Sequence, residues 1–136
     1  KSALQNSYSI ATRITGLQPD NPVVVHPADA AKLGLKSGDT ARIRTPGGAA
    51  ECTVIVHEGV TPGVMAIEHG YGHRELGARA HRIGDQAQPD RPDLRAGINL
   101  NELGLADPTR GGKVIWVDAV SGTAVRQGIP ARLERV

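Results

Sequence analysis

The chain has 136 residues, enough for one domain with a buried core. Hydrophobic residues make up 39% of it but include no Phe, so the core must consist mainly of Val, Ile, Leu and Ala. A net charge of +2, with arginines spread among acidic residues, argues against a nucleic-acid binder, and the single cysteine excludes a disulfide framework, an iron–sulfur cluster or a Cys-based zinc site.

Short strands joined by tight turns are the main pattern. Seventeen Gly and nine Pro supply the turns. In "TARIRT" Ala41 and Ile43 are expected to point inward, and the next alternating segment places Cys52, Val54 and Val56 on one face. The predicted strands are Tyr8–Ile14, Val23–Val25, 40–45, a segment that ends at Val56, 64–67, Lys113–Val120 and 131–136.

A two-turn helix is predicted over Ala28–Leu33. Pro27 suits the first helical position, with His26 as the cap, and Asp29 lies in the first turn, where the helix dipole favours an anion. Gly34 is placed for the left-handed residue that ends such a helix.

A long polar stretch separates the predicted strands in the second half of the chain. Between Gly70 and Gly112 there is little strand pattern and much Gly, Pro, Arg and Asp. Loops of this length in a compact domain are usually functional or disordered. About seven short strands and one or two small helices therefore predict a single mainly-β domain, a barrel with one large polar loop.

The stretch "IEHGYGHREL", residues 67–76, contains two histidines and two glycines. His69 and His73 are four residues apart, but Gly70 and Gly72 disfavour a helix that would bring them to one face. Loop histidines are therefore favoured over a metal site. The third glycine comes two residues too late for a dinucleotide fingerprint, and the flanking elements of that fingerprint are missing. A ligand-binding loop and a strained turn both remain open.

Two further side chains are expected to be structural. Cys52 is predicted to be a buried small hydrophobe that binds no metal, and Trp116 to belong to the core. No GxSxG motif or recognisable Ser, His and Asp arrangement indicates a hydrolase.

The run "NPVVVHPADAAKLGLKSGDTARIRTPGG" resembles one family. It is similar to the C-terminal molybdopterin dinucleotide-binding domain of the dimethyl sulfoxide reductase superfamily. The matching pieces are Asn21-Pro22, Asp29-Ala30, Leu33-Gly34, Gly38-Asp39 and Thr61-Pro62-Gly63. "SYSIATRI", "GINLNELGLADPTRGG" and "GIPARLERV" resemble further family segments, and "EHGYGHRELGA" points to the catalytic subunit of tetrathionate reductase and its arsenate- and polysulfide-reducing relatives.

The resemblance implies a fold and a binding role. The implied fold is a six-stranded double-psi β-barrel with one or two short helices. The implied cofactor is bis(molybdopterin guanine dinucleotide), a molybdenum cofactor, held by backbone amides and short polar side chains. The implied cofactor-binding residues are Ser9, Thr12, Arg13, Gly70, Gly72, His73, Arg74 and Asn99. No catalytic residue and no metal ligand is assigned to these 136 residues.

By the same resemblance, we expect residues 1–136 to be a C-terminal fragment of a larger catalytic subunit. The chain starts with Lys rather than Met, which also suggests a processed or excised piece. The parent enzyme would be a molybdenum oxidoreductase of anaerobic respiration, and the isolated domain would be inactive and largely free of cofactor. Its partners would be the remaining domains of the subunit, without nucleic acid or direct membrane insertion. The implied location is periplasmic or membrane-associated on the exported side, with a cytoplasmic one left open.

The alternative is a free-standing double-psi barrel that recognises proteins or substrates, as in the N-domains of some AAA ATPases. The helix-turn-strand motif alone fits either class, whereas the long polar loop and the "TR" strand favour the cofactor. A pyruvoyl-dependent decarboxylase on the same barrel needs a Gly-Ser cleavage site, and the sequence contains none.

Overall fold

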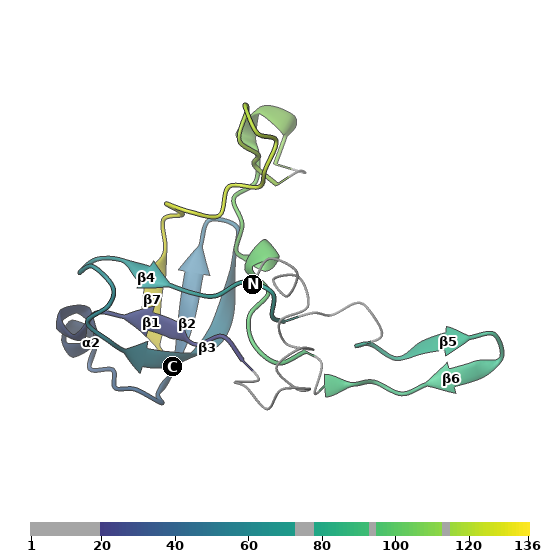
Figure 1. Cartoon of the computed structure of the whole chain (residues 1–136), viewed down its shortest axis with the longest axis horizontal. Coiled ribbons are helices and arrows are strands. Elements are labelled where there is room, and N and C mark those ends of the chain that lie inside the picture. Colours follow the sequence, from purple (N-terminus) through teal and green to yellow (C-terminus); the bar gives the residue numbers. More distant parts are fainter. Residues whose placement is uncertain (1–19, 73–77, 93–94, 113–114) are drawn as a thin grey trace.

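The computed structural model describes residues 20–72, 78–92, 95–112 and 115–136, and a five-stranded sheet dominates these ranges. The strand order is β4-β1-β3-β2-β7, and the sheet curls so that one face encloses the core (Figure 1). Its strands are β1 (Val23–Val25), β2 (Thr40–Thr45), β3 (Gly48–Val56), β4 (Met65–Ala66) and β7 (Arg132–Arg135). The predicted mainly-β class is confirmed. The count of six barrel strands stays a prediction, because Tyr8–Ile14 lies outside the described residues.

Helix α2 (Pro27–Leu33) connects β1 to β2 and has the predicted ends. The His26 imidazole accepts a hydrogen bond from the Ala28 N–H at 3.1 Å, so the cap is confirmed. Gly34 adopts the left-handed conformation with a φ of 64°, which a residue without Cβ tolerates. The chain then turns back, and Leu35 is buried in the core.

The Asp29 carboxylate ties the start of α2 to the turn before β4. It accepts hydrogen bonds from the Gly63 N–H at 2.5 Å and from Lys32 Nζ at 3.0 Å. These bonds hold the pKa of Asp29 below its usual value, with the Gly63 N–H contributing most and Lys32 next. Two motifs that are 34 residues apart in the sequence are thereby joined.

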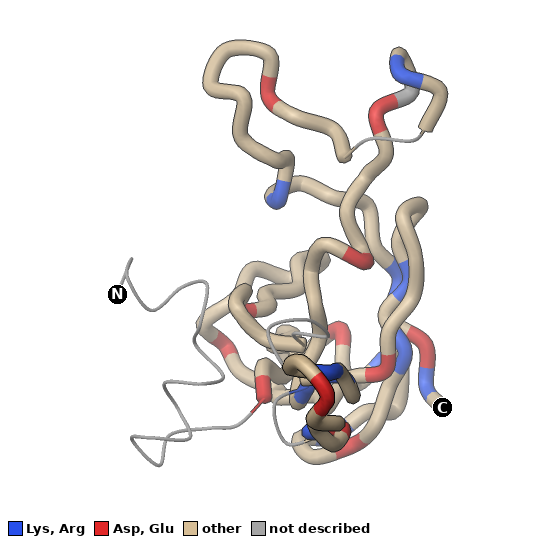
Figure 2. Tube along the Cα trace, turned by 90° about the vertical axis from the view of Figure 1, so that its right-hand side faces the viewer, with Lys and Arg blue, Asp and Glu red and all other residues tan. Residues whose placement is uncertain are grey.

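Strands β2 and β3 form an antiparallel hairpin whose outer face is charged. The two-residue loop Pro46-Gly47 connects them. Ion pairs join Arg42 to Glu51 at 2.9 Å and, across to β7, Arg44 to Glu134 at 2.8 Å. Exposed pairs of this kind contribute only about 0–1 kcal/mol each. Figure 2 shows acidic and basic residues interspersed along the described chain, without a large surface of one sign.

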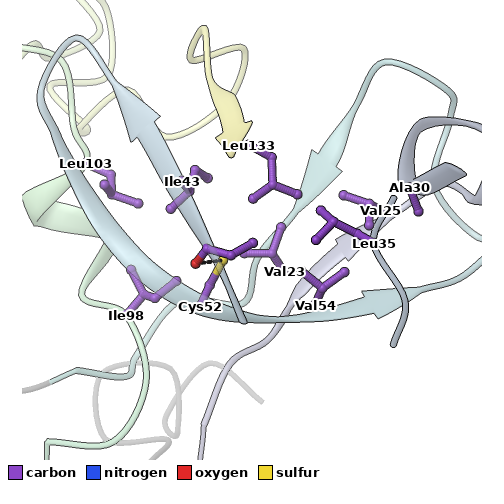
Figure 3. Close-up of a cluster of buried hydrophobic side chains, with 11 residues drawn as sticks. Val23, Val25, Ala30, Leu35, Ile43, Cys52, Val54, Ile98, Leu103 and Leu133 are labelled. Atoms are coloured by element: carbon purple, nitrogen blue, oxygen red, sulfur yellow. Dashed lines mark hydrogen bonds between the residues drawn. The ribbon is translucent and has the colours of Figure 1, made fainter. Parts of the chain in front are cut away.

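The core consists of aliphatic side chains from the inner face of the sheet (Figure 3). Val23 and Val54 lie opposite each other on the parallel strands β1 and β3, and both are fully buried. Cys52 is also buried, and its thiol donates to the Ala41 carbonyl oxygen at 3.4 Å. The other buried core residues are Val25, Ala30, Leu35, Ala41, Ile43, Ile98, Leu103 and Leu133.

A hairpin that sequence analysis does not predict lies within the long polar stretch. Strands β5 (His81–Ile83) and β6 (Gln86–Gln88) pair antiparallel and extend away from the sheet (Figure 1). The turn between them contains Gly84, whose φ is 59°. Apolar and polar residues alternate in a strand when one of its faces is buried. Neither face of the β5–β6 hairpin packs against the core, and Ile83 is 63% exposed. The sequence therefore carries no periodic signal for it.

Two predictions about the segment before β7 are wrong. The described part of the predicted strand Lys113–Val120 makes only isolated bridges, Ala106 to Ile115 and Val117 to Ala124. Trp116 is 44% exposed instead of buried. The segment projects from the sheet (Figure 1). A local turn at Asp118 stabilises it, because the Asp118 carboxylate accepts hydrogen bonds from the Ser121 and Val120 N–H groups at 2.7 and 3.1 Å. Away from the core, Trp116 has little apolar surface to pack against.

Cys52 is expected to react slowly with thiol reagents in the folded chain. Burial raises the pKa of its thiol to about 11, so the thiolate fraction at pH 8 is about a hundredfold smaller than for an ordinary cysteine. The measurement is the rate of modification by an aromatic disulfide reagent with and without denaturant. The control is Thr53→Cys in a Cys52→Ala background, because Thr53 is the exposed neighbour on β3. Equal rates at the two positions would contradict the burial of Cys52.

Asp29→Asn is expected to lower the urea midpoint of unfolding at pH 7. The pKa of Asp29 is depressed in the folded chain, so its carboxylate stabilises the fold above the unfolded-state value near 3.8. This contribution is lost as the pH falls through the folded-state pKa. The difference between the two proteins should therefore shrink below pH 3.8, and a difference that stays constant from pH 7 to pH 3 would refute the role of the charge.

Candidate functional site

A single buried side chain joins the two loop segments that border the candidate site. Asn21 precedes β1 and is only 3% exposed. Its Nδ2 group donates to the Glu68 carbonyl at 2.6 Å and to the Ile98 carbonyl at 3.0 Å. Its Oδ1 accepts from the Ile98 N–H at 2.6 Å. The amide thus pairs with both backbone groups of Ile98, as a neighbouring strand would, and fixes segments 68–72 and 96–99 relative to β1.

Glycines let these two segments touch through their backbones. The Gly72 N–H donates to the Ala96 carbonyl at 3.0 Å. A Cβ on Gly72 would lie 2.6 Å from the Ile98 carbonyl carbon, and one on Gly97 would lie 2.9 Å from the Tyr71 Cβ. Both glycines also have positive φ, 66° and 85°. The close approach therefore requires glycine at both positions.

The β2–β3 turn contacts the residues that directly follow the second of these segments. The Thr45 hydroxyl donates to the Leu103 carbonyl at 2.8 Å and accepts from the Gly48 N–H at 3.2 Å. A Cβ on Gly47 would lie 3.1 Å from the Leu103 carbonyl oxygen. The short 3-10 helix η3 (Leu100–Glu102) is thus held directly against the start of β3.

A polar pocket of about 530 Å³ lies where these parts meet. Asn99 caps η3, with its Oδ1 accepting from the Asn101 N–H at 3.1 Å. The Asn99 Nδ2 group has no hydrogen-bond partner within the described ranges. Arg95 lies in the wall, and its guanidinium is paired with Asp90 at 2.6 Å. The lining residues are Ala49, Ala50, Glu51, Gly72, Arg95, Gly97, Ile98, Asn99 and Glu102.

The structure brings together two of the predicted cofactor-binding residues. Gly72 and Asn99 line the same pocket, although 26 residues lie between them in the sequence. Gly70 precedes them on the first segment with a φ of 97°, but it is not part of the lining. The remaining predicted residues, Ser9, Thr12, Arg13, His73 and Arg74, lie outside the described residues. Contact of any of these residues with a cofactor stays a prediction.

Sequence reasoning misses several residues of this site. It treats Asn21 as part of a motif rather than as a hydrogen-bonding centre, and it assigns no role to Gly97, Arg95 or Glu102. The only local signal is an asparagine before an apolar strand, followed far along the chain by "AGIN". A bond that spans 77 residues leaves no periodic trace in the sequence.

A second hollow, the apolar groove, lies on the other side of η3. It has a volume of about 750 Å³ and runs between the β4 edge and the segment that leads into β7. Val64 and Ile115 border it and are 52% and 39% exposed. Its other apolar lining residues include Ile43, Met65, Ile67, Leu100, Leu103, Val125, Ile129 and Pro130.

Neither a metal centre nor a membrane span is found in the part of the chain that the structure describes. No group of three His, Cys, Asp or Glu side chains is arranged to hold an ion there. His81 is exposed, and its Nδ1 lies 2.9 Å from the Arg79 carbonyl oxygen. No helix in the described ranges is long and apolar enough to cross a bilayer.

Comparison with known proteins identifies the family. The profile of the family described as "Molydopterin dinucleotide binding domain" matches residues 5–114. The chain therefore belongs to the molybdopterin dinucleotide-binding domain family, and the recognition made from the sequence motifs is confirmed.

Among curated proteins, the chain is similar to subunits of several reductases. The chain is 48% identical to a tetrathionate reductase subunit of Salmonella typhimurium, over 99% of this chain and 13% of that protein. It is 32% identical to a selenate reductase subunit of Mesobacillus selenatarsenatis, over 88% of this chain and 13% of the relative. It is 29% identical to the arsenate respiratory reductase molybdopterin-containing subunit of Chrysiogenes arsenatis, over 76% of this chain and 10% of the relative. The chain thus spans about an eighth of the length of the first two relatives.

A solved structure shares the fold. Acetylene hydratase from Pelobacter acetylenicus superposes with a TM-score of 0.57 over 88% of this chain and 15% of its own, at 22% identity. At that identity the likeness shows the fold alone. The curled arrangement of the five-stranded sheet is therefore shared with that protein.

Proposed function

We propose that the chain binds bis(molybdopterin guanine dinucleotide) as one domain of a larger molybdenum oxidoreductase. The observation that carries the proposal is the meeting of Gly72 and Asn99 in one polar pocket of a molybdopterin dinucleotide-binding domain. Gly72 allows its segment to pack directly against the backbone of Ile98 and Asn99, and Asn99 offers the pocket an amino group without a partner in the described ranges.

The charges of the pocket suggest which part of the cofactor it holds. Among its described lining residues, Glu51 and Glu102 are acidic and Arg95 is basic, and Arg95 is already paired with Asp90. Such a wall suits an uncharged polar group, such as a guanine or pterin edge, and disfavours a pyrophosphate. The proposed partners of the pyrophosphate are Arg13 and Arg74, since an arginine matches phosphate geometry with its planar fork. Ser9, Thr12, Gly70 and His73 complete the proposed contacts.

The cofactor, when bound, would supply the two-electron redox chemistry of the parent enzyme. This chain would bind and orient it and contribute no catalytic residue. The 48% identity to a tetrathionate reductase subunit supports a tetrathionate reductase-like parent, and the selenate and arsenate relatives support a reductase of this kind more broadly. By the same resemblance, the proposed location of the parent is the exported side of the membrane. Family membership favours this function over the free-standing recognition module.

The apolar groove supports the proposal that residues 1–136 are one domain of a longer polypeptide. The groove exposes Val64 and Ile115, and the chain covers only 13% of the Salmonella relative. Contiguous apolar surface of this kind often marks a site where another protein surface packs. The proposed occupant is an apolar surface from the remaining domains of the same subunit. The isolated chain would then offer one wall of the cofactor site and no turnover.

Substitution of Asn99 in the full-length enzyme is expected to reduce cofactor retention. Asn99→Asp keeps the oxygen that caps η3 and removes the Nδ2 donor, so it separates binding from capping. Loss of that donor should weaken binding by about 1–3 kcal/mol. Arg13→Ala should act in the same direction, and Thr12→Val less strongly. The measurement is the molybdenum and guanine nucleotide content of the purified variants.

The matched control for Asn99 is Asn101→Ala. Asn101 has the same side chain two residues away and is exposed, and it lines the apolar groove instead of the polar pocket. Arg44→Ala on the outer face of the sheet is a second control. Both controls should retain the full cofactor content. Full occupancy in both Asn99→Asp and Arg13→Ala would overturn the proposed site.

Val64→Asp tests the apolar groove. In the isolated chain it should reduce binding of a hydrophobic dye, because the exposed apolar surface becomes smaller. In the full-length enzyme it should make the domain easier to release by limited proteolysis, because a charge would be buried in the interface. Leu33→Asp is the control, since Leu33 is similarly exposed (40%) but lies on α2, outside the groove. Unchanged proteolysis of the full-length Val64→Asp enzyme would show that the groove does not face the rest of the subunit.

A further inference from the structure

We propose that Asn21 is a positioning residue for the cofactor pocket, which it does not itself line. The proposal rests on the function proposed above. Asn21 is followed at once by Pro22 and then by β1, whose Val23 is fully buried in the core. A side chain anchored next to the core thus makes three hydrogen bonds to the two segments that carry Gly72 and Asn99.

The bonding pattern requires an amide. Two carbonyl oxygens, of Glu68 and Ile98, need donors, and the Ile98 N–H needs an acceptor. Asparagine supplies two N–H donors and one oxygen from a single short side chain, which no carboxylate, hydroxyl or aliphatic side chain of this size can do. Asn21 is only 3% exposed and both of its bonds to Ile98 are buried, so loss of either would leave a buried backbone group without a partner.

The surroundings of Asn21 leave the two segments little room to adjust. A Cβ on Gly97 would collide with Asn21 Oδ1 and the Tyr71 Cβ, so only glycine fits at this position. On the opposite side of the contact, the backbone of Ile98 and Asn99 occupies the space beside Gly72. A shift of Ile98 away from Asn21 would therefore move Asn99 and Gly72 together, and these are the residues of the wall that would face the ligand.

The decisive variant is Asn21→Asp in the full-length enzyme. It has the same shape and keeps the acceptor for the Ile98 N–H, but it removes both donors and places a carboxylate against two carbonyl oxygens. At pH 7.5 we expect the variant to retain about tenfold less guanine nucleotide after gel filtration. An effect of this size is typical when a buried carbonyl group loses its hydrogen-bond donor. Asn21→Gln, which keeps the amide but adds one methylene group, should fold and lose nucleotide to a lesser degree.

Two comparisons separate positioning from general destabilisation. Val54→Ala removes volume from the core without touching the pocket, and it should lower the unfolding temperature at least as much as Asn21→Asp while retaining the nucleotide. Lowering the pH to 5.5 should partly restore retention in Asn21→Asp only, because a protonated carboxyl can donate one bond. The neighbouring titratable residues Asp20, Glu68, His69, Tyr71 and Arg95 are common to the wild type, which serves as the pH control.

The outcomes distinguish this inference from the proposed function. Loss of nucleotide in both Asn99→Asp and Asn21→Asp, with retention in Val54→Ala, supports both. Loss in Asn99→Asp with full retention in Asn21→Asp and Asn21→Gln overturns the positioning role alone. Full retention in Asn99→Asp and Arg13→Ala overturns the cofactor site itself. Equal loss in Val54→Ala and Asn21→Asp reduces Asn21 to a contributor to overall stability and overturns the inference.

Discussion

The hydrogen bonds of the Asn21 amide are the contact on which the arrangement of the polar loops depends. Segments 68–72 and 96–99 have no place in the five-stranded sheet, yet parts of their backbone are buried and need partners. Asn21 supplies these partners from a position next to β1. These hydrogen bonds fix the two loop segments relative to the valine core, although the segments contain few apolar side chains of their own.

Glycine has a complementary role at the same place. Gly72 and Gly97 allow backbone to lie directly on backbone, and Gly47 and Gly48 do the same where the β2–β3 turn meets η3. Four of the residues that line the polar pocket have small side chains or none, namely Ala49, Ala50, Gly72 and Gly97. Such a wall suits a flat ligand whose polar edge can meet backbone groups.

The two hollows of the domain differ in chemistry and lie on different sides of η3. The polar pocket carries carboxylates and one paired arginine, whereas the apolar groove exposes Val64 and Ile115. The proposed function assigns the polar pocket to a ligand and the apolar groove to the rest of the polypeptide. One small domain can present both the polar pocket and the apolar groove because η3 and its flanking residues separate the two hollows.

The sequence by itself determined the local elements. Alternation placed Ala41, Ile43 and Cys52 inside, and the caps at His26 and Gly34 set the ends of α2, because these features depend on neighbours a few residues away. The family followed from motifs at fixed spacing. Only the tertiary structure decided that Gly72 and Asn99 share a pocket, that Trp116 is exposed and that β5 and β6 pair outside the core. These outcomes depend on contacts between distant segments, such as the Asn21–Ile98 pair across 77 residues, and periodicity carries no information about such contacts.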